Sequence, residues 1–423
     1  MNVLIISFED RRWGIARLPK VLQAAGFRVA ALCPTDNTLA YTKYIERHFK
    51  LPVAKSAHRL APAIHRAMQA WQPLLVIPSD EMVVALLHAL RRDLRAGNKL
   101  GWPAAMIDVL ERSMGEPAHH DAMLFKNDTQ ELARTVGVRV PEGSRVRTAA
   151  EAGEVAGRLG YPVILKQSFS SGGNGVKVCQ TPEQLAAAYE QMAPRATNPL
   201  KIRLRGLLGR DWYPTPGRLW VQQHIVGNPA MYTFVALHGR MLAGFAGLPR
   251  TTLSATGPST VVEFRAHPEL AEASARMVAA LGATGFVSFD FVIETATGKA
   301  FLLECNPRPN QVSHLGKRMG VDLCATLLAG LRAGPVASDA ASAPLVANRC
   351  ETITLFPHEW LRASDSPAFD TFHHDVPWDD ATLLKRLASF RITPTLSQNS
   401  MNPFNLMSLA KRYLTSFLLT ARQ

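Results

Sequence analysis

Two acidic residues face each other across a predicted β-hairpin near residue 300. Strand-forming residues run from Phe286 to Ile293 and from Ala300 to Cys305, and Ala296-Thr297-Gly298 supplies a turn between them. If the loop is centred on Thr297, Asp290 lies directly opposite Glu304. Two carboxylates in this arrangement repel each other unless a cation lies between them. The pattern therefore predicts a cation site on a hairpin, and the alternative is an ordinary hairpin with a solvated charged face.

The same register assigns residues to the two faces of the hairpin. Ser288 lies opposite Asn306 on the face that carries the acids, because side chains alternate along a strand. The other face, which we expect to be buried, carries Phe289, Phe291, Leu303 and Cys305. Carboxylate and amide oxygens are ligands that suit Mg²⁺ or Mn²⁺ better than zinc. We therefore predict a metal site formed by Asp290, Glu304 and Asn306.

Composition indicates a globular protein of two or three domains. The chain has 423 residues, of which 47% are hydrophobic and 19% are charged. Its N-terminus reads as a first β-strand and not as a signal peptide, and we find no apolar run near the ~20 residues of a membrane span. The five cysteines are scattered and form no CxxC pair, which argues against a disulfide framework and a structural zinc. We therefore expect a cytoplasmic protein without a membrane span.

A formal charge of +13 raises the question of an anionic partner. Most of the excess is dispersed arginine, but one basic cluster has Trp212 and Tyr213 among its members. Its cations are Arg195, Lys201, Arg203, Arg205, Arg210 and Arg218. Three interpretations stay open for this cluster: nucleic acid, an anionic substrate or nucleotide phosphates, and a solvated loop. Because no known nucleic-acid module surrounds it, we do not expect nucleic-acid binding.

Residues 1 to about 115 alternate strands and helices. Val3 to Ser7 and Leu74 to Pro78 read as strands, and Ala16 to Ala25 reads as a helix. This alternation predicts an open parallel sheet that binds ligands at the carboxyl ends of its strands. Ser79-Asp80-Glu81 lies at such an end, although capping of the helix from Met82 to Leu94 is the explanation that we favour.

A glycine-rich loop follows the strand from Tyr161 to Lys166 and precedes the strand from Val176 to Val178. Glycines let backbone N–H groups approach phosphate oxygens, and a lysine at the end of a strand adds a positive charge. The loop glycines are Gly172, Gly173 and Gly175. A flexible polar hairpin tip is the alternative. The loop is neither a Walker P-loop nor a Rossmann turn, because a strand follows it.

The chain after residue 330 carries fewer signals. Gly334 to Pro344 reads as a small-residue linker, Thr352 to Phe356 as a strand, and His373-His374-Asp375 as part of a polar surface turn. The two adjacent histidines would point to opposite sides, so we do not predict a metal there. Leu406 to Leu419 reads as an amphipathic helix that packs on its own protein and not on a membrane.

The order of these motifs resembles the ATP-grasp superfamily, which includes biotin carboxylase, D-alanine ligase and the carbamoyl-phosphate synthase large chain. The motifs are Lys126, Lys166 with its glycine loop, the strand from Gln222 to Gly227, Asp290, and Glu304-x-Asn306-Pro307-Arg308. The resemblance covers residues 116 to 330. It implies an α/β and α+β protein: an open parallel-sheet domain at 1–115, a two-subdomain ATP-grasp fold at 116–330 with its glycine-loop subdomain at about 142–222, and a linker and C-terminal extension at 331–423.

The resemblance also implies roles for single residues. Lys126 and Lys166 would hold the α- and β-phosphates of ATP, Gly172, Gly173 and Gly175 would form a lid, and Asp290, Glu304 and Asn306 would bind Mg²⁺ or Mn²⁺. Gln222, Gln223 and the Ile225 backbone would contact adenine. Arg308, with Lys166, would act on the transferring phosphoryl group. Relatives often bind the ribose with an acid, whereas this chain has Gly227-Asn228-Pro229, so Asn228 is a substitute candidate.

We therefore expect an ATP-dependent ligase that joins a carboxylate to an amine or a thiol through an acyl phosphate and releases ADP and phosphate. Its partners would be small-molecule carboxylates and amines, and a homo-oligomer is compatible with the sequence. Arg308, Lys317 and Arg318 would attract the carboxylate, and Asn310, Gln311, Ser313 and His314 would orient it or pack the loop. The alternatives are a carboxylase or carbamoyl-phosphate-type enzyme that phosphorylates bicarbonate, a nucleotide-binding regulatory protein with weakened catalysis, and a nucleic-acid binder.

Overall fold

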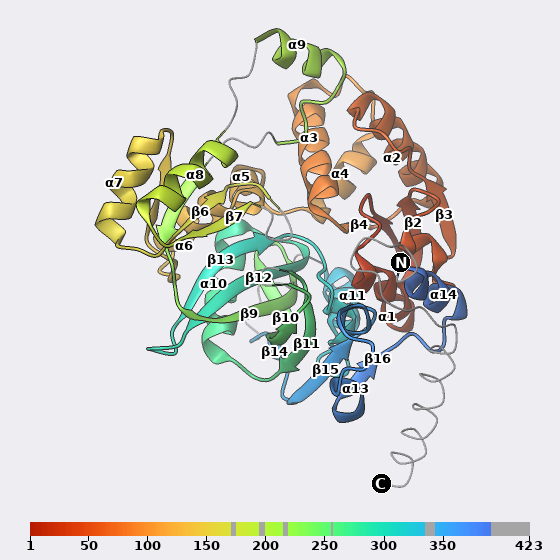
Figure 1. Cartoon of the computed structure of the whole chain (residues 1–423). Coiled ribbons are helices and arrows are strands. Elements are labelled where there is room, and N and C mark those ends of the chain that lie inside the picture. Colours follow the sequence, from red (N-terminus) through yellow and green to blue (C-terminus); the bar gives the residue numbers. More distant parts are fainter. Residues whose placement is uncertain (171–174, 194–198, 215–218, 255–256, 335–342, 391–423) are drawn as a thin grey trace.

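The computed structural model describes residues 1–170, 175–193, 199–214, 219–254, 257–334 and 343–390. Its strands form three sheets, one in an N-terminal unit, one in a small unit and one large central sheet (Figure 1). The predicted mixed architecture, with a parallel sheet followed by antiparallel ones, is confirmed.

The N-terminal unit is a four-stranded parallel sheet in the order β3-β2-β1-β4. Its strands are β1 (Asn2–Ile6), β2 (Arg28–Cys33), β3 (Arg47–Lys50) and β4 (Leu75–Pro78). Its helices are η1 (Trp13–Arg17), α1 (Leu18–Ala24), η2 (Thr38–Tyr41), α2 (Ala57–Trp71), α3 (Glu81–Gly97) and α4 (Ala104–Ser113). Both faces of β1 are buried, because Leu4 and Ile6 pack under α2 and α3 while Val3 and Ile5 pack toward the large sheet.

The small unit is an antiparallel sheet in the order β5-β8-β6-β7. Its strands are β5 (Gly143–Val146), β6 (Val163–Gln167), β7 (Val176–Cys179) and β8 (Leu219–Gln223), and its helices are α7 (Ala149–Leu159), α8 (Pro182–Met192) and α9 (Pro199–Leu207). The predicted hairpin around the glycine loop is confirmed, since Lys166 of β6 pairs with Val176 of β7. Of the loop glycines, Gly172 and Gly173 lie outside the described residues.

The large sheet runs β13-β12-β9-β10-β11-β15-β16, and β14 pairs with β10. Its strands are β9 (Gly227–Leu237), β10 (Arg240–Thr252), β11 (Ser259–Phe264), β12 (Gly285–Glu294), β13 (Ala300–Asn306), β14 (Leu345–Val346), β15 (Glu351–Leu355) and β16 (His373–Asp375). The associated helices are η3 (Pro117–His119), α5 (His120–Leu124), α6 (Lys126–Thr135), α10 (Pro268–Leu281), η4 (Ser313–Leu315), α11 (Leu323–Ala333), α12 (His358–Arg362), α13 (Ala368–Thr371) and α14 (Ala381–Ser389).

Alternating residues of β9 separate the two faces of this sheet. Tyr232 and Phe234 pack in the core that contains α10, whereas Val235 and Leu237 pack in the core that contains α11. The α11 core also contains Val3 and Ile5 of β1, so a single apolar core joins the N-terminal sheet to the large sheet. This junction fixes the carboxyl ends of β1 and β4 beside the end of β13.

One detail of the predicted hairpin is wrong. A β-bulge follows the Asp290–Glu304 pair, so Phe291 pairs with Leu302 and not with Leu303. Leu302 is therefore fully buried, while Leu303 and Cys305 are only half-buried. The inserted residue shifts the alternation of β13 by one position, and turn chemistry alone gives no sign of it.

The predicted polar surface turn at His373-His374-Asp375 is also wrong. These residues form β16, which pairs in parallel with β15, and both His374 and Asp375 are buried. Thus residues beyond 330 add β14, β15 and β16 to the large sheet. The predicted helix from Leu406 to Leu419 lies outside the described residues. Among the described helices, none has the length and apolar character to cross a membrane.

Candidate functional site

The acidic pair lies on neighbouring strands of one hairpin, in the predicted register. Asp290 of β12 is opposite Glu304 of β13, and Ser288 is opposite Asn306. The Asn306 amide Nδ2 donates to Asp290 Oδ2 at 3.1 Å. Burial raises the pKa of Asp290 well above its usual range, and the adjacent Glu304 carboxylate raises it further. The two carboxyl groups therefore share a proton near neutral pH.

Lys126, the first residue of α6, connects this pair to the glycine loop. Its Nζ lies 2.7 Å from Glu304 Oε2 and donates to Ser170 Oγ at 3.3 Å. Its backbone N–H donates to the Ser168 carbonyl at 2.9 Å. Burial would raise the pKa of Glu304, but the positive charge of Lys126 outweighs it and holds that pKa below its usual value. Glu304 is therefore the ionised member of the acidic pair.

Lys166 lies on β6 with only 4% of its surface exposed. Burial lowers its pKa to about 7, and the nearby positive charge of Lys126 acts in the same direction. A buried lysine with this pKa gains a proton readily when an anion arrives beside it. Lys126 contacts Glu304, and Lys166 lies close enough to both residues for their charges to affect its pKa, which is an arrangement suited to a polyanion.

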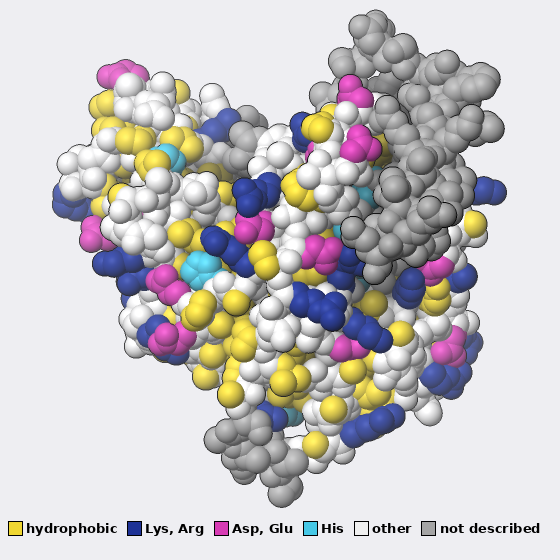
Figure 2. All heavy atoms as spheres, turned by 90° about the horizontal axis from the view of Figure 1, so that it is seen from below, with side chains coloured by type: hydrophobic (Ala, Val, Ile, Leu, Met, Phe, Trp, Pro, Cys, Tyr) yellow, Lys and Arg dark blue, Asp and Glu magenta, His cyan; other side chains and the backbone are white. Residues whose placement is uncertain are grey.

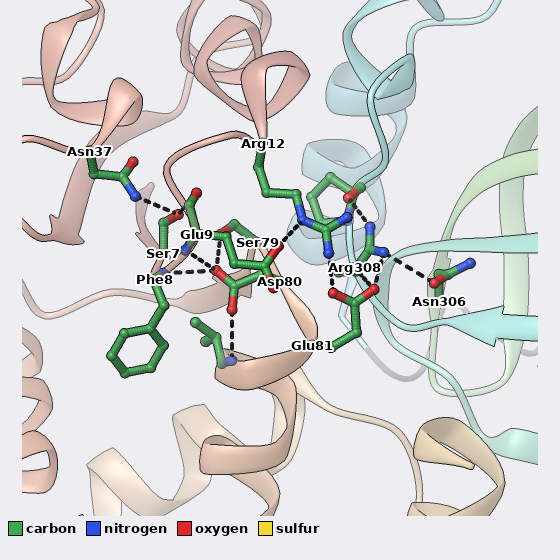
Figure 3. Close-up of polar contacts among 12 residues, drawn as sticks. Ser7, Phe8, Glu9, Arg12, Asn37, Ser79, Asp80, Glu81, Asn306 and Arg308 are labelled. Carbon is green, nitrogen blue, oxygen red and sulfur yellow. Dashed lines mark hydrogen bonds and ion pairs between the residues drawn. The ribbon is translucent and has the colours of Figure 1, made fainter. Parts of the chain in front are cut away.

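Arg308 is fixed by the N-terminal unit (Figure 3). Its guanidinium donates to Glu81 Oε1 through Nε at 3.0 Å and through Nη2, and Nη2 also donates to Asn306 Oδ1 at 3.2 Å. The other oxygen of Glu81 accepts from Arg12, which in turn pairs with Glu9 at 2.7 Å. Burial would raise the pKa of Glu81, but the guanidiniums of Arg308 and Arg12 lower it to about 2. Glu81 is therefore a permanent anion between two cations.

Asp80 holds the loop after β1 at the carboxyl end of β4. Its Oδ1 caps α3 by accepting from the Val83 N–H at 2.9 Å, so the predicted capping role is confirmed. Its Oδ2 also accepts from the backbone N–H groups of Phe8 at 2.8 Å and Glu9 at 3.1 Å. Figure 3 shows how this places Glu9 and Arg12 beside Glu81.

Sequence reasoning missed the roles of Glu81, Arg12 and Ser170. The sequence does place Ser79-Asp80-Glu81 at the end of a parallel strand, where ligands bind, and this signal would have singled out Glu81. Arg12 carried no signal, because its ion pair depends on how the N-terminal unit meets the hairpin.

The predicted adenine segment lies between the small and large sheets. Gln222 is buried on β8, where its side-chain oxygen accepts from Gln130 Nε2 at 3.5 Å. Gln223 is half-buried and its backbone N–H donates to the Glu142 carbonyl at 2.8 Å. Ile225 is buried, and Asn228 is exposed near the start of β9, opposite Ile293.

Gly175 is the described glycine of the loop. Its carbonyl accepts from the Gln167 N–H at 2.8 Å, and a Cβ at this position would lie 2.5 Å from Ser170 Oγ. A side chain at Gly175 would therefore displace Ser170, which contacts Lys126. Glycine is required here by a close approach.

Several residues after Arg308 pack the loop. Asn310 donates to Thr233 Oγ1 at 2.7 Å and accepts from the Ser313 hydroxyl at 3.0 Å, and Gln311 Nε2 donates to the Ser259 carbonyl at 3.3 Å. His314 Nε2 lies 2.8 Å from Asp375 Oδ2. Lys317 and Arg318 are exposed, and Arg318 pairs with Glu351, so the structure does not bring these two cations to Arg308.

These residues surround a small pocket between the N-terminal unit, the glycine-loop sheet and the hairpin. Its lining combines the ionic groups above with a few apolar side chains: Glu81, Val84, Met123, Leu124, Lys126, Phe169, Ser170, Glu304, Cys305, Asn306, Pro307 and Arg308. Cations and anions therefore alternate around one space, which is suited to a charged ligand and its counter-ion.

The acidic pair fits a hard divalent cation. The described residues contain no group of three or more His, Cys, Asp or Glu side chains arranged for a metal, so the candidate set is two carboxylates and one amide. Asp290 lies directly opposite Glu304, so a cation between them would relieve their repulsion, and oxygen donors favour Mg²⁺ or Mn²⁺. The Asn306 amide oxygen faces Arg308 and its nitrogen faces Asp290, so this side chain would have to turn to act as a ligand.

The two aromatic residues of the predicted basic cluster pack against other aromatic side chains. Trp212 is buried and stacks near Phe8, and Tyr213 meets Phe169 edge-on. Arg195 and Arg218 lie outside the described residues. On the face in Figure 2, lysines and arginines lie among acidic side chains over most of the described surface. That face therefore shows no continuous basic stripe of the kind typical of nucleic-acid binding, and α9, which carries Lys201, Arg203 and Arg205, lies at the opposite end of the molecule.

Comparisons with known proteins indicate an ATP-binding domain in this part of the chain. Residues 126–201 match the family model for the carbamoyl-phosphate synthase L chain, ATP binding domain. The carbamoyl phosphate synthase large chain of Rubrobacter xylanophilus is 24% identical over 306 residues, which cover 71% of this chain and 26% of that protein. This chain thus spans about a quarter of the length of that relative.

Solved structures share the fold. The biotin carboxylase of Campylobacter jejuni superposes with a TM-score of 0.57 at 18% identity, covering 77% of this chain and 70% of that one. The L-amino acid ligase of Bacillus licheniformis gives 0.53 at 16% identity, with 77% and 73% covered. Together with the order of motifs from Lys126 to Arg308, these matches lead to one conclusion: the chain has an ATP-grasp fold, and its segment 126–201 is similar to the ATP-binding domain of the carbamoyl-phosphate synthase large chain.

Proposed function

We propose that this protein is an ATP-dependent ligase that activates a carboxylate as an acyl phosphate and joins it to an amine or a thiol. One observation carries the proposal: Lys126 lines the same pocket as Glu304 and Arg308, although it lies far from them in the sequence. Phosphoryl transfer needs positioned cations around the phosphates and a divalent metal, and this pocket has residues for both.

In this proposal, Lys126 and Lys166 bind the α- and β-phosphates of ATP, and the loop with Gly172, Gly173 and Gly175 covers them. Gln222, Gln223 and the Ile225 backbone contact adenine, and Asn228 contacts the ribose. The ion pair of Lys126 with Glu304, and the electrostatic interaction of the buried Lys166 with both of them, support the phosphate assignment. The exposed position of Asn228 leaves its side chain accessible to a ligand hydroxyl.

Asp290, Glu304 and Asn306 would hold Mg²⁺ or Mn²⁺. When bound, the metal would neutralise charge on the transferring phosphate. Lys126, which pairs with Glu304 in this structure, would then be released to contact phosphate oxygens. Arg308 would face the transferred phosphoryl group, and the ion pair with Glu81 would keep its guanidinium in place.

The proposed chemistry has two steps. A carboxylate oxygen of the substrate attacks the γ-phosphorus, the bond between that phosphorus and the β–γ bridging oxygen breaks, and ADP leaves. The amine or thiol then attacks the acyl carbon, the bond from that carbon to the phosphate oxygen breaks, and phosphate leaves with its oxygen. The nucleophile loses one proton. The covering loop would keep water away from the acyl phosphate.

A second candidate is phosphorylation of bicarbonate, which would take the place of the substrate carboxylate. The relatives favour it, since a carbamoyl phosphate synthase and a biotin carboxylase are among them. The L-amino acid ligase favours carboxylate–amine ligation. We place the reaction in the cytoplasm, where ATP is abundant, and all five cysteines are free thiols, as expected in a reducing compartment.

For the domains, we assign residues 1–115 to the N-terminal unit, 116–330 to the ATP-grasp unit with its glycine-loop subdomain at about 142–222, and 331–423 to a C-terminal extension. Strands β14 to β16 of this extension pair with the large sheet, which supports treating it as part of the same compact body.

The test is ADP formation from Mg-ATP with pooled carboxylates and hydroxylamine, which traps an acyl phosphate as a hydroxamate. We expect carboxylate-dependent ADP and hydroxamate, both lost in Glu304→Ala. Glu294→Ala, which removes an acid at the turn of the same hairpin, is the control. ADP formation that needs bicarbonate alone would favour the second candidate. ATP binding without turnover in any pool would reject both reactions.

A further inference from the structure

Helix α9 and the turn after it expose an unusual amount of aliphatic surface. Fifteen large hydrophobic side chains are exposed among the described residues, and five of them lie within nine consecutive positions. These five are Leu200 (73% exposed), Ile202 (55%), Leu204 (54%), Leu207 (78%) and Leu208 (42%). Single exposed leucines are common on protein surfaces, but a cluster of exposed aliphatic side chains indicates an interaction surface.

The leucines form a stripe along one side of the helix. Leu204, Leu207 and Leu208 have the i, i+3, i+4 spacing that places side chains on one face, and Leu200 lies one turn before Leu204. Lys201, Arg203 and Arg205 lie at positions that border this stripe. No Asp or Glu occurs between Glu190 and Asp211, so the cations have no acidic neighbour in the local sequence.

The helix is attached at its C-terminal end, through backbone and not through the leucines. The Gly209 carbonyl accepts from the Ala57 N–H at 2.6 Å, and the Leu208 carbonyl accepts from Ser56 Oγ at 2.7 Å. Gly209 has φ of +59° and its Cα lies against the ring of His58, so the chain turns here in a way that favours glycine. Trp212 Nε1 donates to the Lys55 carbonyl at 3.0 Å.

This attachment holds α9 as a projection from the body of the protein. In Figure 1 the helix lies at the top of the molecule, above α3 and away from the large sheet. The five exposed aliphatic side chains all belong to this one helix and the turn after it. A protein partner would have to supply a matching groove, whereas a lipid bilayer deforms around a convex helix and accepts its apolar side chains.

We propose that α9 docks on an anionic phospholipid bilayer, with its leucines at the acyl boundary and Lys201 and Arg203 on headgroup phosphates. Arg205 is half-buried and donates to the carbonyls of Arg210 and Tyr213, so it holds the turn after the helix. Cations on both borders of an apolar stripe match a plane of phosphates around acyl chains, which is the pattern of interfacial helices. A helix of nine residues is short, so the attachment is weak and reversible. The proposal does not depend on the catalytic function proposed above.

The experiment measures co-sedimentation of the full chain with vesicles of phosphatidylcholine alone, or mixed with an equal part of phosphatidylglycerol. We expect binding to the mixed vesicles, little binding to phosphatidylcholine alone, and loss of binding at high salt. Leu204→Glu with Leu207→Glu, and separately Arg203→Glu, should each lower the affinity on the order of tenfold. Leu100→Glu and Arg158→Glu, at exposed positions on other elements, should bind as the parent chain does.

Three results would overturn the proposal. The first is absence of binding to the anionic vesicles, and the second is binding that the α9 variants leave unchanged. The third is self-association without lipid, measured by sedimentation velocity, that Leu204→Glu with Leu207→Glu abolishes, because the stripe would then bind a second copy of this chain. Thermal melting checks folding, and we expect the α9 variants to melt with the parent because the substituted side chains are exposed.

Discussion

Arg308 donates two hydrogen bonds to a single carboxylate oxygen of Glu81, although 227 residues separate the two positions. The pair joins the end of β13 to the first residue of α3. Since Arg12 occupies the other oxygen, the Glu81 carboxylate cannot rotate away without breaking both ion pairs. Glu81 is therefore a positioning residue for the arginine that would face the transferred phosphate.

Glu81→Gln should reduce the rate of ADP formation about 10- to 100-fold and leave ATP affinity within about twofold, because a misplaced cation costs transition-state stabilisation and not nucleotide binding. Steady-state kinetics and equilibrium ATP binding measure the two effects. Glu272→Gln, at an exposed acid that pairs with Arg276 on the surface, is the control. Equal losses of rate and affinity would show that Glu81 supports the nucleotide site as a whole.

Binding of Mg²⁺ at the acidic pair should release a proton at pH 7. The pKa of Asp290 is raised by burial and by Glu304, so the metal has to displace the shared proton, and the release should disappear once the pH exceeds that raised pKa. Calorimetric titration with MgCl₂ in two buffers of different ionisation enthalpy measures the proton count. Asp290→Asn should abolish the release, and Glu294→Gln should not. A proton count of zero for the parent chain would contradict the shared proton.

Lys166 should make ATP binding take up a proton, whereas Mg²⁺ binding at the acidic pair should release one. Its pKa of about 7 is low because the lysine is buried, and phosphate contacts would raise it. In the absence of metal, ATP binding should therefore take up a proton, and affinity should fall as the pH rises above about 7. Lys166→Ala should bind ATP more weakly at every pH, and Lys166→Arg, which stays charged, should lose the pH dependence. Unchanged ATP affinity in Lys166→Ala would reject the phosphate role.

The hairpin was predictable from sequence because its information is local. Turn residues, strand lengths and alternation fixed the Asp290–Glu304 register, and the β6–β7 hairpin around the glycine loop followed in the same way. The bulge after that register was not predictable, because no Gly or Pro marks it. The shift of Leu302 to the buried face is decided by packing against the core.

Contacts between segments that are far apart in the sequence could not be predicted from the sequence alone. The ion pair of Glu81 with Arg308 and the burial of Asp375 depend on how the N-terminal sheet and the last strands meet the large sheet. His373-His374-Asp375 looked like a surface turn since polar residues usually are exposed. Asp375 is buried instead, because Arg17 and His314 form hydrogen bonds with its carboxylate inside the protein.

Asp375→Asn should therefore destabilise the fold by about 2 to 4 kcal/mol at pH 7, since it leaves the buried Arg17 guanidinium without its anion. Burial would raise the pKa of Asp375, but Arg17 and His314 hold it far below its usual value. This stabilisation is complete above the unfolded pKa of about 3.9 and is lost as the pH falls. Chemical denaturation at pH 7 and below pH 4 measures it, and the difference between parent and variant should shrink at low pH. The exposed Asp370→Asn is the control.

Gly14 packs directly on the backbone that follows Arg308. A Cβ on Gly14 would lie 2.3 Å from the Gln311 carbonyl oxygen and 2.5 Å from Gln311 Cα, and neither backbone atom can move as a side chain would. Gly14→Ala should therefore cost about 1 to 3 kcal/mol of unfolding free energy, as overpacking does in other buried sites. Gly157→Ala has open space on α7 and should instead gain about 0.4 to 1 kcal/mol.

Gly14→Ala should also change the positions of the arginines in the candidate site. Arg12 lies two residues before Gly14, and Arg308 lies three before Gln311, so separating the two backbones moves both guanidiniums relative to Glu81. We expect Gly14→Ala to lower ADP formation under conditions where the protein is still fully folded, with ATP affinity retained. A variant that unfolds earlier but turns over at the parent rate when folded would show that the Gly14–Gln311 contact stabilises the fold without positioning the arginines.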